Sequence, residues 1–413
     1  MIINLKTLGA FFFLIFTLSS FYFYEPVFFS AELLKLVYWL LCSCVILLSV
    51  KKLLYTKEQL VFANGLRILL FSIFFSMVPA FISWGQSPLL TLRATFPFLG
   101  FISYFYLLTI NPSIKFLERI IWVFSFSYIF IYFLSLSLLP EVYFGSFADR
   151  RIDDMRAVFR LFIPGRGFLF LSFFFAVGRY IYNRRIIWLY LSIFLFAVIL
   201  MHVIRQYILF SFVISAIALL WNLTWWRKVL IVLSAILIGG YVIENSNVIQ
   251  SLVLLTETQI GTDKPTEDIR VTAYKYFSFN FSPNAFNAFF GNGVPHEAST
   301  YGAYYTNIIN ADQKLYLSDV GYAQIYGLFG ILGLLASLFL MIRTFFLRVD
   351  IKYLYLKLFM IYVLFANILS GYFLSYHNVV AISIVFFMLE KVHTNVGINA
   401  HTSKLDLRYK NES

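Results

Sequence analysis

Bands of apolar residues recur along the whole chain, and each band of about 20 residues is long enough to cross roughly 30 Å of hydrocarbon. The 413 residues are 61% hydrophobic and only 13% charged, with a mean hydropathy of +0.82. A soluble domain cannot bury that much apolar surface, so much of it must face lipid. The sequence therefore predicts an all-α integral membrane protein, with residues 1–413 forming one polytopic domain.

About twelve bands are expected to span the membrane, because each has the length that a crossing helix needs. They lie near residues 8–24, 31–50, 66–84, 92–110, 117–139, 166–183, 186–203, 205–222, 227–243, 319–343, 354–373 and 376–391. The turn between the seventh and eighth bands is expected within Met201–Gln206. The longest polar segment, residues 244–318, separates the ninth band from the tenth.

Lysine and arginine set the expected orientation, since cytoplasmic loops carry an excess of them. Every second loop is basic, with residues such as Lys51, Lys115 and Arg343, while the alternate loops are nearly free of basic residues. This pattern places the tail, residues 392–413, in the cytoplasm and the 244–318 segment outside, which in a bacterium means the periplasm. Much of the net charge of +12 is then an orientation signal, so we expect the inner membrane as location and no nucleic-acid partner.

Several arginines break this charge rule on the outer side. They are Arg150, Arg151, Arg156 and Arg160 in one outer loop, Arg166 at its exit, and Arg205 at the outer end of the eighth band. A bound anion is one reason for such an arrangement. The alternatives are a self-paired surface with Asp153 and Asp154, and an Arg205 that merely extends to the interface.

The 244–318 segment is expected to form an ordered, mainly helical cap. Thr266 can cap a helix whose apolar face carries Ile269, Ala273 and Phe277 at helical spacing. A second short helix, Ala285–Phe290, is expected to end at Gly291.

The chemistry expected on the outer face is the binding of a phosphate-bearing lipid. Arg166, Arg205 and Arg270 come from distant parts of the chain but share that face, and guanidinium groups bind phosphate through two parallel hydrogen bonds. A membrane-bound anion with an outward head group suggests a polyprenyl diphosphate carrying sugar. Asp319, at the outer mouth of a band, is the expected base for an acceptor hydroxyl. Weaker candidates for that role are Asp268, His296 and Glu297.

Each of these residues also has a structural interpretation. Arg270 can pair with Glu267 one helical turn earlier, and Asp319 can serve only as an N-cap. His296 can be an ordinary loop residue. Gly327, Gly330 and Gly333 are typical of a helix-packing face. The histidines lack metal-ligand spacing, so no metal site is predicted.

The order of these features resembles the bacterial O-antigen polymerase and O-antigen ligase superfamily. The matching pieces are Arg205, Arg270 with Tyr274 and Tyr276, Phe290-Gly291-Asn292-Gly293, and Asp319 through Gly330. The resemblance covers roughly residues 159 to 333. It implies a GT-C-like fold and an inverting, metal-independent glycosyltransferase that needs no cofactor and takes an undecaprenyl-diphosphate-linked oligosaccharide at the periplasmic face.

Residue roles follow from this resemblance. Arg166, Arg205 and Arg270 would bind the diphosphate, with Arg160 as a fourth, while Asp319, Arg270 and Arg205 would be catalytic. Contacts to the acceptor are expected from His296, Glu297, Tyr274 and Lys275. Membrane lipid and a chain-length regulator protein are the expected partners.

Three functions remain open, of which a polysaccharide repeat-unit polymerase is favoured. Ligases of the superfamily usually carry a His-Asn pair where this chain has Asp319-Val320, so this departure disfavours an O-antigen ligase that acts on lipid A core. The third alternative is a transporter or lipid-linked sugar flippase. A flippase is expected to place charge within several spans, and the apolar bands here hold little Asp or Glu. The product of a polymerase would be O-antigen, capsule or exopolysaccharide.

Overall fold

The computed structural model describes residues 5–56, 59–139, 141–145, 152–153, 158–159, 161–202, 204–221 and 269–394. The regular secondary structure in these ranges is helical apart from two antiparallel two-residue strands, β1 (Ile152–Asp153) and β2 (Val158–Phe159). Six segments of the described chain are long and apolar enough to cross a membrane: Ala31–Leu54, Ala63–Trp84, Pro88–Ile110, Ile114–Ser137, Gly321–Phe346 and Ile351–Leu369. The predicted class, a helical multi-pass membrane protein, agrees with these segments. The predicted number of twelve spans stays a prediction, and the band 227–243 lies outside the described residues.

The helices of the first half follow the predicted bands closely. They are α1 (Leu5–Ser20), α2 (Ala31–Leu54), α3 (Ala63–Phe75), α4 (Met77–Trp84), α5 (Pro88–Thr95), α6 (Ser103–Ile110) and α7 (Ile114–Ser137), with short 3-10 turns η1 (Tyr22–Tyr24) and η2 (Phe96–Ile102). Serine side chains help to start α2, α5 and α7. In each case the hydroxyl of Ser30, Ser87 or Ser113 accepts a hydrogen bond from the backbone N–H three residues later.

The second half continues with α8 (Arg166–Asn183), α9 (Ile186–Met201) and α10 (Arg205–Leu220). After residue 268 come α13 (Ile269–Lys275), α14 (Ala285–Phe290), α15 (Thr300–Tyr304), the 3-10 turn η6 (Leu317–Asp319), α16 (Gly321–Phe346), η7 (Ile351–Tyr353) and α17 (Leu354–Leu369). A last helix covers residues 379–394. The expected turn after the seventh band is confirmed, since α9 ends at Met201 and α10 begins at Arg205.

Two helices form the centre of the bundle. Residues 167–178 of α8 are all buried, and so are residues 379–390 of the last helix. Both sequences are apolar on every side, as is typical of a helix surrounded by others. Helix α8 packs against α7, α9, α10 and α17, so its first residue, Arg166, is placed among the ends of these neighbours.

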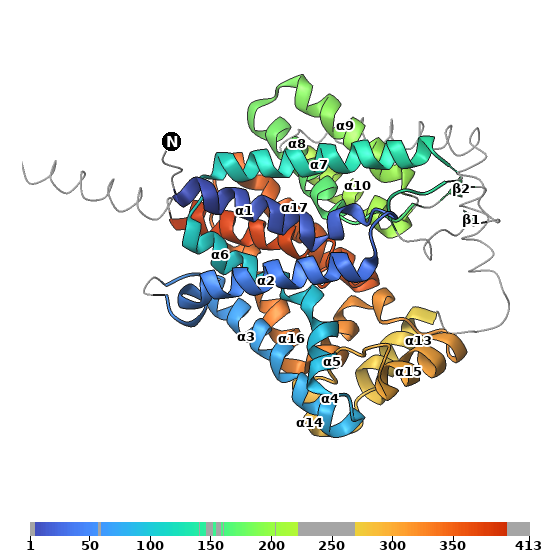
Figure 1. The fold of residues 1–413 in the computed structure, drawn as a ribbon. Coiled ribbons are helices and arrows are strands. Elements are labelled where there is room, and N and C mark those ends of the chain that lie inside the picture. Colours follow the sequence, from blue (N-terminus) through green and yellow to red (C-terminus); the bar gives the residue numbers. More distant parts are fainter. Residues whose placement is uncertain are drawn as a thin grey trace, which may run out of the picture.

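The described part of the cap, residues 269–318, is mainly helical, as predicted, and lies beside α4 and α5, on the opposite side of the molecule from α7, α8 and α9 (Figure 1). Helix α14 has the predicted bounds and ends at Gly291. Ala273 and Phe277 are buried as expected, but Ile269 is 52% exposed, and α13 passes into a π-helical turn, η4 (Tyr276–Asn280). A second π-helical turn, η5 (Tyr305–Asp312), follows α15. The predicted cap residue Thr266 and its neighbours Glu267 and Asp268 lie outside the described residues.

Within the predicted glycine stripe on α16, Gly330 lies at a helix break, while Gly333 packs against Ser72 of α3. Gly330 has a φ of 71°, so the helix is interrupted there, and the turn that follows α14 fits against the break. The backbone N–H groups of Asn292 and Gly293 donate to the carbonyls of Gly327 and Leu328, both at 3.0 Å. These bonds engage carbonyls close to the break, where the regular helical pattern is interrupted. Of the three glycines, Gly330 therefore serves this contact and does not belong to a regular helix-packing face.

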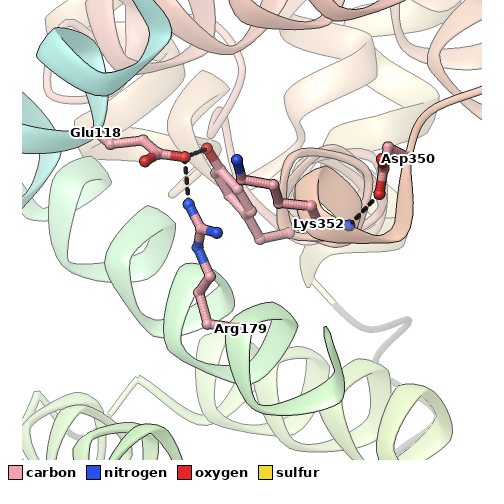
Figure 2. A network of polar contacts seen from close by, with 5 residues as sticks. Glu118, Arg179, Asp350 and Lys352 are labelled. Atoms are coloured by element: carbon pink, nitrogen blue, oxygen red, sulfur yellow. Dashed lines mark hydrogen bonds and ion pairs between the residues drawn. The ribbon is translucent and has the colours of Figure 1, made fainter. Parts of the chain in front are cut away.

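Polar contacts also fix the far end of the bundle, which we call the Glu118 end. Glu118 of α7 pairs with Arg179 of α8 at 2.6 Å, and Tyr355 of α17 donates to the same carboxylate oxygen at 3.0 Å (Figure 2). Nearby in the same view, the Asp350 carboxylate accepts from the Lys352 backbone N–H at 2.9 Å. Three helices are thus joined through one carboxylate.

Candidate functional site

The predicted arginines and Asp319 lie where helices begin at the opposite end of the bundle. Arg166 is the first residue of α8 and Arg205 the first of α10, while Asp319 closes η6, two residues before α16. The loop of residues 370–378, between α17 and the last helix, lies at the same end. We call this set of helix starts together with the 370–378 loop the Arg166 end.

Arg166 is held among aromatic rings and tyrosine hydroxyls. Its guanidinium carbon lies 5.2 Å from the ring centre of Tyr207 and 5.8 Å from that of Phe162. Its Nη2 donates a long hydrogen bond of 3.5 Å to the Tyr207 hydroxyl. Its Nε is shut off from solvent and has no hydrogen-bond partner among the described residues. The aromatic rings therefore position the Arg166 guanidinium group, while its Nε–H donor has no hydrogen-bond acceptor among the described residues.

A chain of contacts runs from Arg166 to the start of α16. The Tyr207 hydroxyl donates to Ser370 Oγ at 3.3 Å, and the next residue, Gly371, donates its N–H to the Ser318 carbonyl at 2.8 Å. Ser318 directly precedes Asp319, whose carboxylate accepts a long hydrogen bond of 3.5 Å from the Ser318 hydroxyl. The beginnings of α8, α10 and α16 therefore meet on the 370–378 loop.

Asp319 and Arg270 form the cap side of this arrangement. Partial burial raises the pKa of the Asp319 carboxyl above its ordinary value, and the nearby positive charge of Arg270 acts in the opposite direction. The Tyr274 hydroxyl, one turn after Arg270, donates to the Ile368 carbonyl and ties α13 to the end of α17. Arg270 thus lies close enough to Asp319 for its charge to act on that carboxyl.

The structural role suggested for Asp319 is wrong. Helix α16 begins at Gly321 with Val320 in the capping position, and no side chain caps its first turn. The Asp319 carboxylate is therefore not used as an N-cap. The pairing of Arg270 with Glu267 cannot be compared with the structure, because Glu267 lies outside the described residues.

The other predicted residues are distributed differently. The backbone N–H of His296 donates to Gln86 between α4 and α5 at 2.9 Å, and His296 Nδ1 accepts from the Ala298 N–H at 3.1 Å. No hydrogen bond or ion pair within the described ranges joins His296 to Asp319. Glu297 and Lys275 are exposed on the cap. Arg160 lies outside the described residues, as do Arg150, Arg151 and Arg156.

Sequence reasoning missed the 370–378 loop. Besides Ser370 and Gly371 it supplies Tyr376, whose hydroxyl donates to Glu25 Oε1 at 2.9 Å, and His377, whose ring lies 3.9 Å from that of Tyr376. The available signal was a cluster of polar residues, Ser370-Gly371 and Tyr376-His377-Asn378, at the facing ends of the last two apolar bands. In the sequence this segment contributes only to the orientation argument, because it lacks lysine and arginine.

Glu25 reaches this loop through an unusual backbone turn. Residues 22–25 all have positive φ between 51° and 66°, although none is glycine. Each such residue costs about 1 kcal/mol or more, so neighbouring structure must hold the turn in place. The Glu25–Tyr376 bond and the contact between the Tyr22 and Tyr376 rings, 5.2 Å apart, are part of that support.

An apolar cavity of about 720 Å³ lies along α10 and α17, starting one turn beyond Arg205. Its walls are aliphatic and aromatic side chains, including Leu209, Phe210, Leu358 and Phe365. No group of three His, Cys, Asp or Glu side chains in the described part of the chain is arranged to hold a metal ion.

Comparisons with protein-family models and with curated proteins find no match to this chain. The functional assignment therefore rests on the residues and their geometry.

Proposed function

We propose that the protein is a polysaccharide repeat-unit polymerase of the bacterial inner membrane. It transfers a growing glycan from its undecaprenyl diphosphate to the terminal sugar of a lipid-linked repeat unit on the periplasmic face. Together with the six candidate spans, the other apolar bands form about twelve spans in a GT-C-like arrangement, with the cap over the outer face.

The observation that carries this proposal is the contact chain from Arg166 through Tyr207, Ser370 and Ser318 to Asp319 beside Arg270. It connects the guanidinium groups of Arg166 in α8 and Arg270 in α13 with the carboxylate of Asp319 in η6. Guanidinium groups keep their charge at low dielectric and bind phosphate through two parallel bonds, so they suit a diphosphate at the edge of a membrane.

Each group has a distinct part in the reaction. The arginines stabilise the charge that develops on the departing diphosphate, and the loss of one such donor typically costs about 3 kcal/mol, or a hundredfold or more in rate. Asp319 accepts the proton of the attacking hydroxyl as the new glycosidic bond forms. The raised pKa of its carboxyl makes it a stronger base than an exposed aspartate, while the charge of Arg270 acts to lower that pKa.

The apolar cavity supports a lipid-linked substrate. It follows α10 and α17 away from Arg205, so a polyprenyl chain in the cavity would leave its diphosphate near the first turn of α10. Burial of hydrocarbon in such a cavity stabilises the bound lipid in proportion to its covered area.

The buried carboxylates elsewhere argue against a transport pathway. Glu118 is paired with Arg179 and Tyr355. Glu390 accepts from the backbone N–H groups of Val61 and Phe62 and from the Tyr104 hydroxyl. Both carboxylates are engaged in joining helices, whereas a flippase needs charges that face its substrate.

The test is the replacement of Arg270 by Ala in a strain that lacks the native gene. We expect loss of polymer with normal amounts of protein in the membrane. The matched control is Arg343→Ala, because Arg343 is exposed near the other end of α16, about 30 Å along the helix. Long-chain polysaccharide in the Arg270→Ala strain would contradict the proposal.

A further inference from the structure

The 370–378 loop holds His377 directly against the start of α8. A side chain at Gly167 would lie 3.0 Å from the His377 carbonyl oxygen and 2.7 Å from Asn378 Oδ1, so only glycine permits this approach. The ring of His377 lies tilted against that of Tyr376, with the ring centres 3.9 Å apart, and Tyr376 is fixed by its bond to Glu25. The imidazole is therefore a rigid neighbour of Arg166.

Polar atoms at this contact have no partners. Arg166 Nε, His377 Nδ1 and Asn378 Oδ1 are all shut off from solvent and form no hydrogen bond within the described ranges. Buried polar groups are nearly always satisfied, so three unsatisfied atoms on facing elements indicate a place where a polar ligand or ordered water completes the structure. Two of these three belong to groups that can hydrogen-bond an anion, the guanidinium and a protonated imidazole.

The charge state of His377 follows from its surroundings. Burial lowers the pKa of its imidazole well below the ordinary value, and the positive charge of Arg166 lowers it further. His377 is therefore neutral at physiological pH while no anion is bound. The effects of burial and of the Arg166 charge both depend on what occupies the space beside Arg166, because a nearby negative charge favours the protonated imidazole of His377.

The other titratable groups around His377 come from several elements. Tyr372 and Tyr376 belong to the same loop, Tyr22 and Glu25 come from η1 and the residue after it, and Tyr207 comes from α10. Tyr128 of α7, Tyr362 of α17 and His202, between α9 and α10, also lie near Arg166. The Tyr128 hydroxyl lies 2.6 Å from His202 Nε2. His202 Nδ1 lies 2.7 Å from the Val198 carbonyl, so both nitrogens of His202 are engaged. Among the described groups, His377 is the histidine at this end with an unused ring nitrogen.

We propose that His377 takes up one proton from solution when a diphosphate binds beside Arg166, so that substrate binding and protonation of this imidazole are linked. The bound anion offsets the charge of Arg166, and the imidazolium gains a hydrogen-bond acceptor for its unused nitrogen. His377 then adds a further cationic donor to the diphosphate site, and the imidazolium releases its proton again when the diphosphate leaves. This inference rests on the proposed function, because it assigns the diphosphate to the Arg166 end.

The experiment is isothermal titration calorimetry of the full chain in detergent micelles with farnesyl diphosphate, at pH 7, in Pipes and in Tris buffer. These buffers differ in ionisation enthalpy, so the difference in observed heat gives the number of protons taken up. We expect uptake of a sizeable fraction of one proton for the natural protein. The affinity should fall as the pH rises, by up to about tenfold per pH unit, because the protonated form binds more tightly.

Variants identify the group that takes up the proton. His377→Gln should still bind farnesyl diphosphate but lose the uptake, whereas His296→Gln and His202→Gln should keep it. Uptake that persists in His377→Gln, or disappears in His202→Gln instead, would overturn the inference and leave the proposed function standing.

The natural protein alone already gives a decisive result. Binding without proton uptake overturns the inference even if the His377 variants do not fold, and His377→Asn provides a second substitution at the same position. If the natural protein does not bind farnesyl diphosphate at all, the diphosphate site fails, and the proposed function fails with it.

Discussion

Gly291 and Gly330 lie backbone against backbone, one at the end of α14 and the other at the break in α16. A Cβ atom on Gly330 would lie 2.5 Å from the Gly291 nitrogen, and a Cβ atom on Gly291 would lie 2.5 Å from Cα of Phe329. Both residues also have positive φ, 90° and 71°. The two glycine motifs in the sequence are therefore halves of one contact between the cap and the bundle.

Replacement of either glycine by alanine should destabilise the protein. The new methyl group meets backbone atoms that cannot move alone, and the positive φ adds about 1 to 2 kcal/mol of strain. With the cost of overpacking, we expect a loss of about 2 to 5 kcal/mol. Thermal unfolding in detergent would measure it, with Leu335→Ala on the exposed face of α16 as the control. Unchanged unfolding temperatures for Gly330→Ala would contradict the observed contact.

The pair of Glu118 and Arg179 should matter for stability and not for catalysis. Glu118→Ala leaves the Arg179 guanidinium and the Tyr355 hydroxyl without their shared acceptor, and removing one partner of a largely buried pair costs about 3 kcal/mol or more. The double variant Glu118→Gln with Arg179→Met should lose less free energy of unfolding than the sum of the losses in the two corresponding single variants. A thermal unfolding series measures this coupling, and strict additivity would count against the network in Figure 2.

The ionisation of Asp319 should control how the reaction rate falls at low pH. The carboxyl must be ionised to accept a proton, so activity should fall as the pH decreases through its pKa, which burial places above the ordinary aspartate value of about 4. Asp319→Asn should lower kcat by at least about a hundredfold at every pH. Asp312→Asn, an exposed change on the cap, is the control. An Asp319→Asn enzyme with an ordinary rate would remove Asp319 from the mechanism.

Patterns within one segment were predictable from the sequence. The helix Ala285–Phe290 and its end at Gly291 follow from helix-forming residues between Asn284 and a glycine, and the turn before Arg205 follows from the lengths of two apolar bands. Local propensity and hydrophobic length suffice in such cases, because no distant contact decides them.

Features that depend on distant segments were not predictable. Gly330 looks like part of a packing stripe until the turn at Gly291 is placed against it. The left-handed turn of residues 22–25 contains no glycine and depends on Tyr376, more than 300 residues away. His377 was not selected because its neighbour Arg166 belongs to another helix, and the sequence does not show which helix starts meet. The sequence predicts that Arg166 and Asp319 share the outer face, but the contacts through Tyr207 and Ser370 that connect them depend on the fold.

The most direct measurement is the size distribution of surface polysaccharide from a strain that lacks this gene. The account predicts that long chains disappear and that glycan of a single repeat unit remains. The natural gene and its Arg343→Ala form should restore long chains, while the Arg270→Ala form should not. Accumulation of lipid-linked polymer in the deletion strain would indicate a ligase and contradict the account, as would an unchanged ladder of long chains.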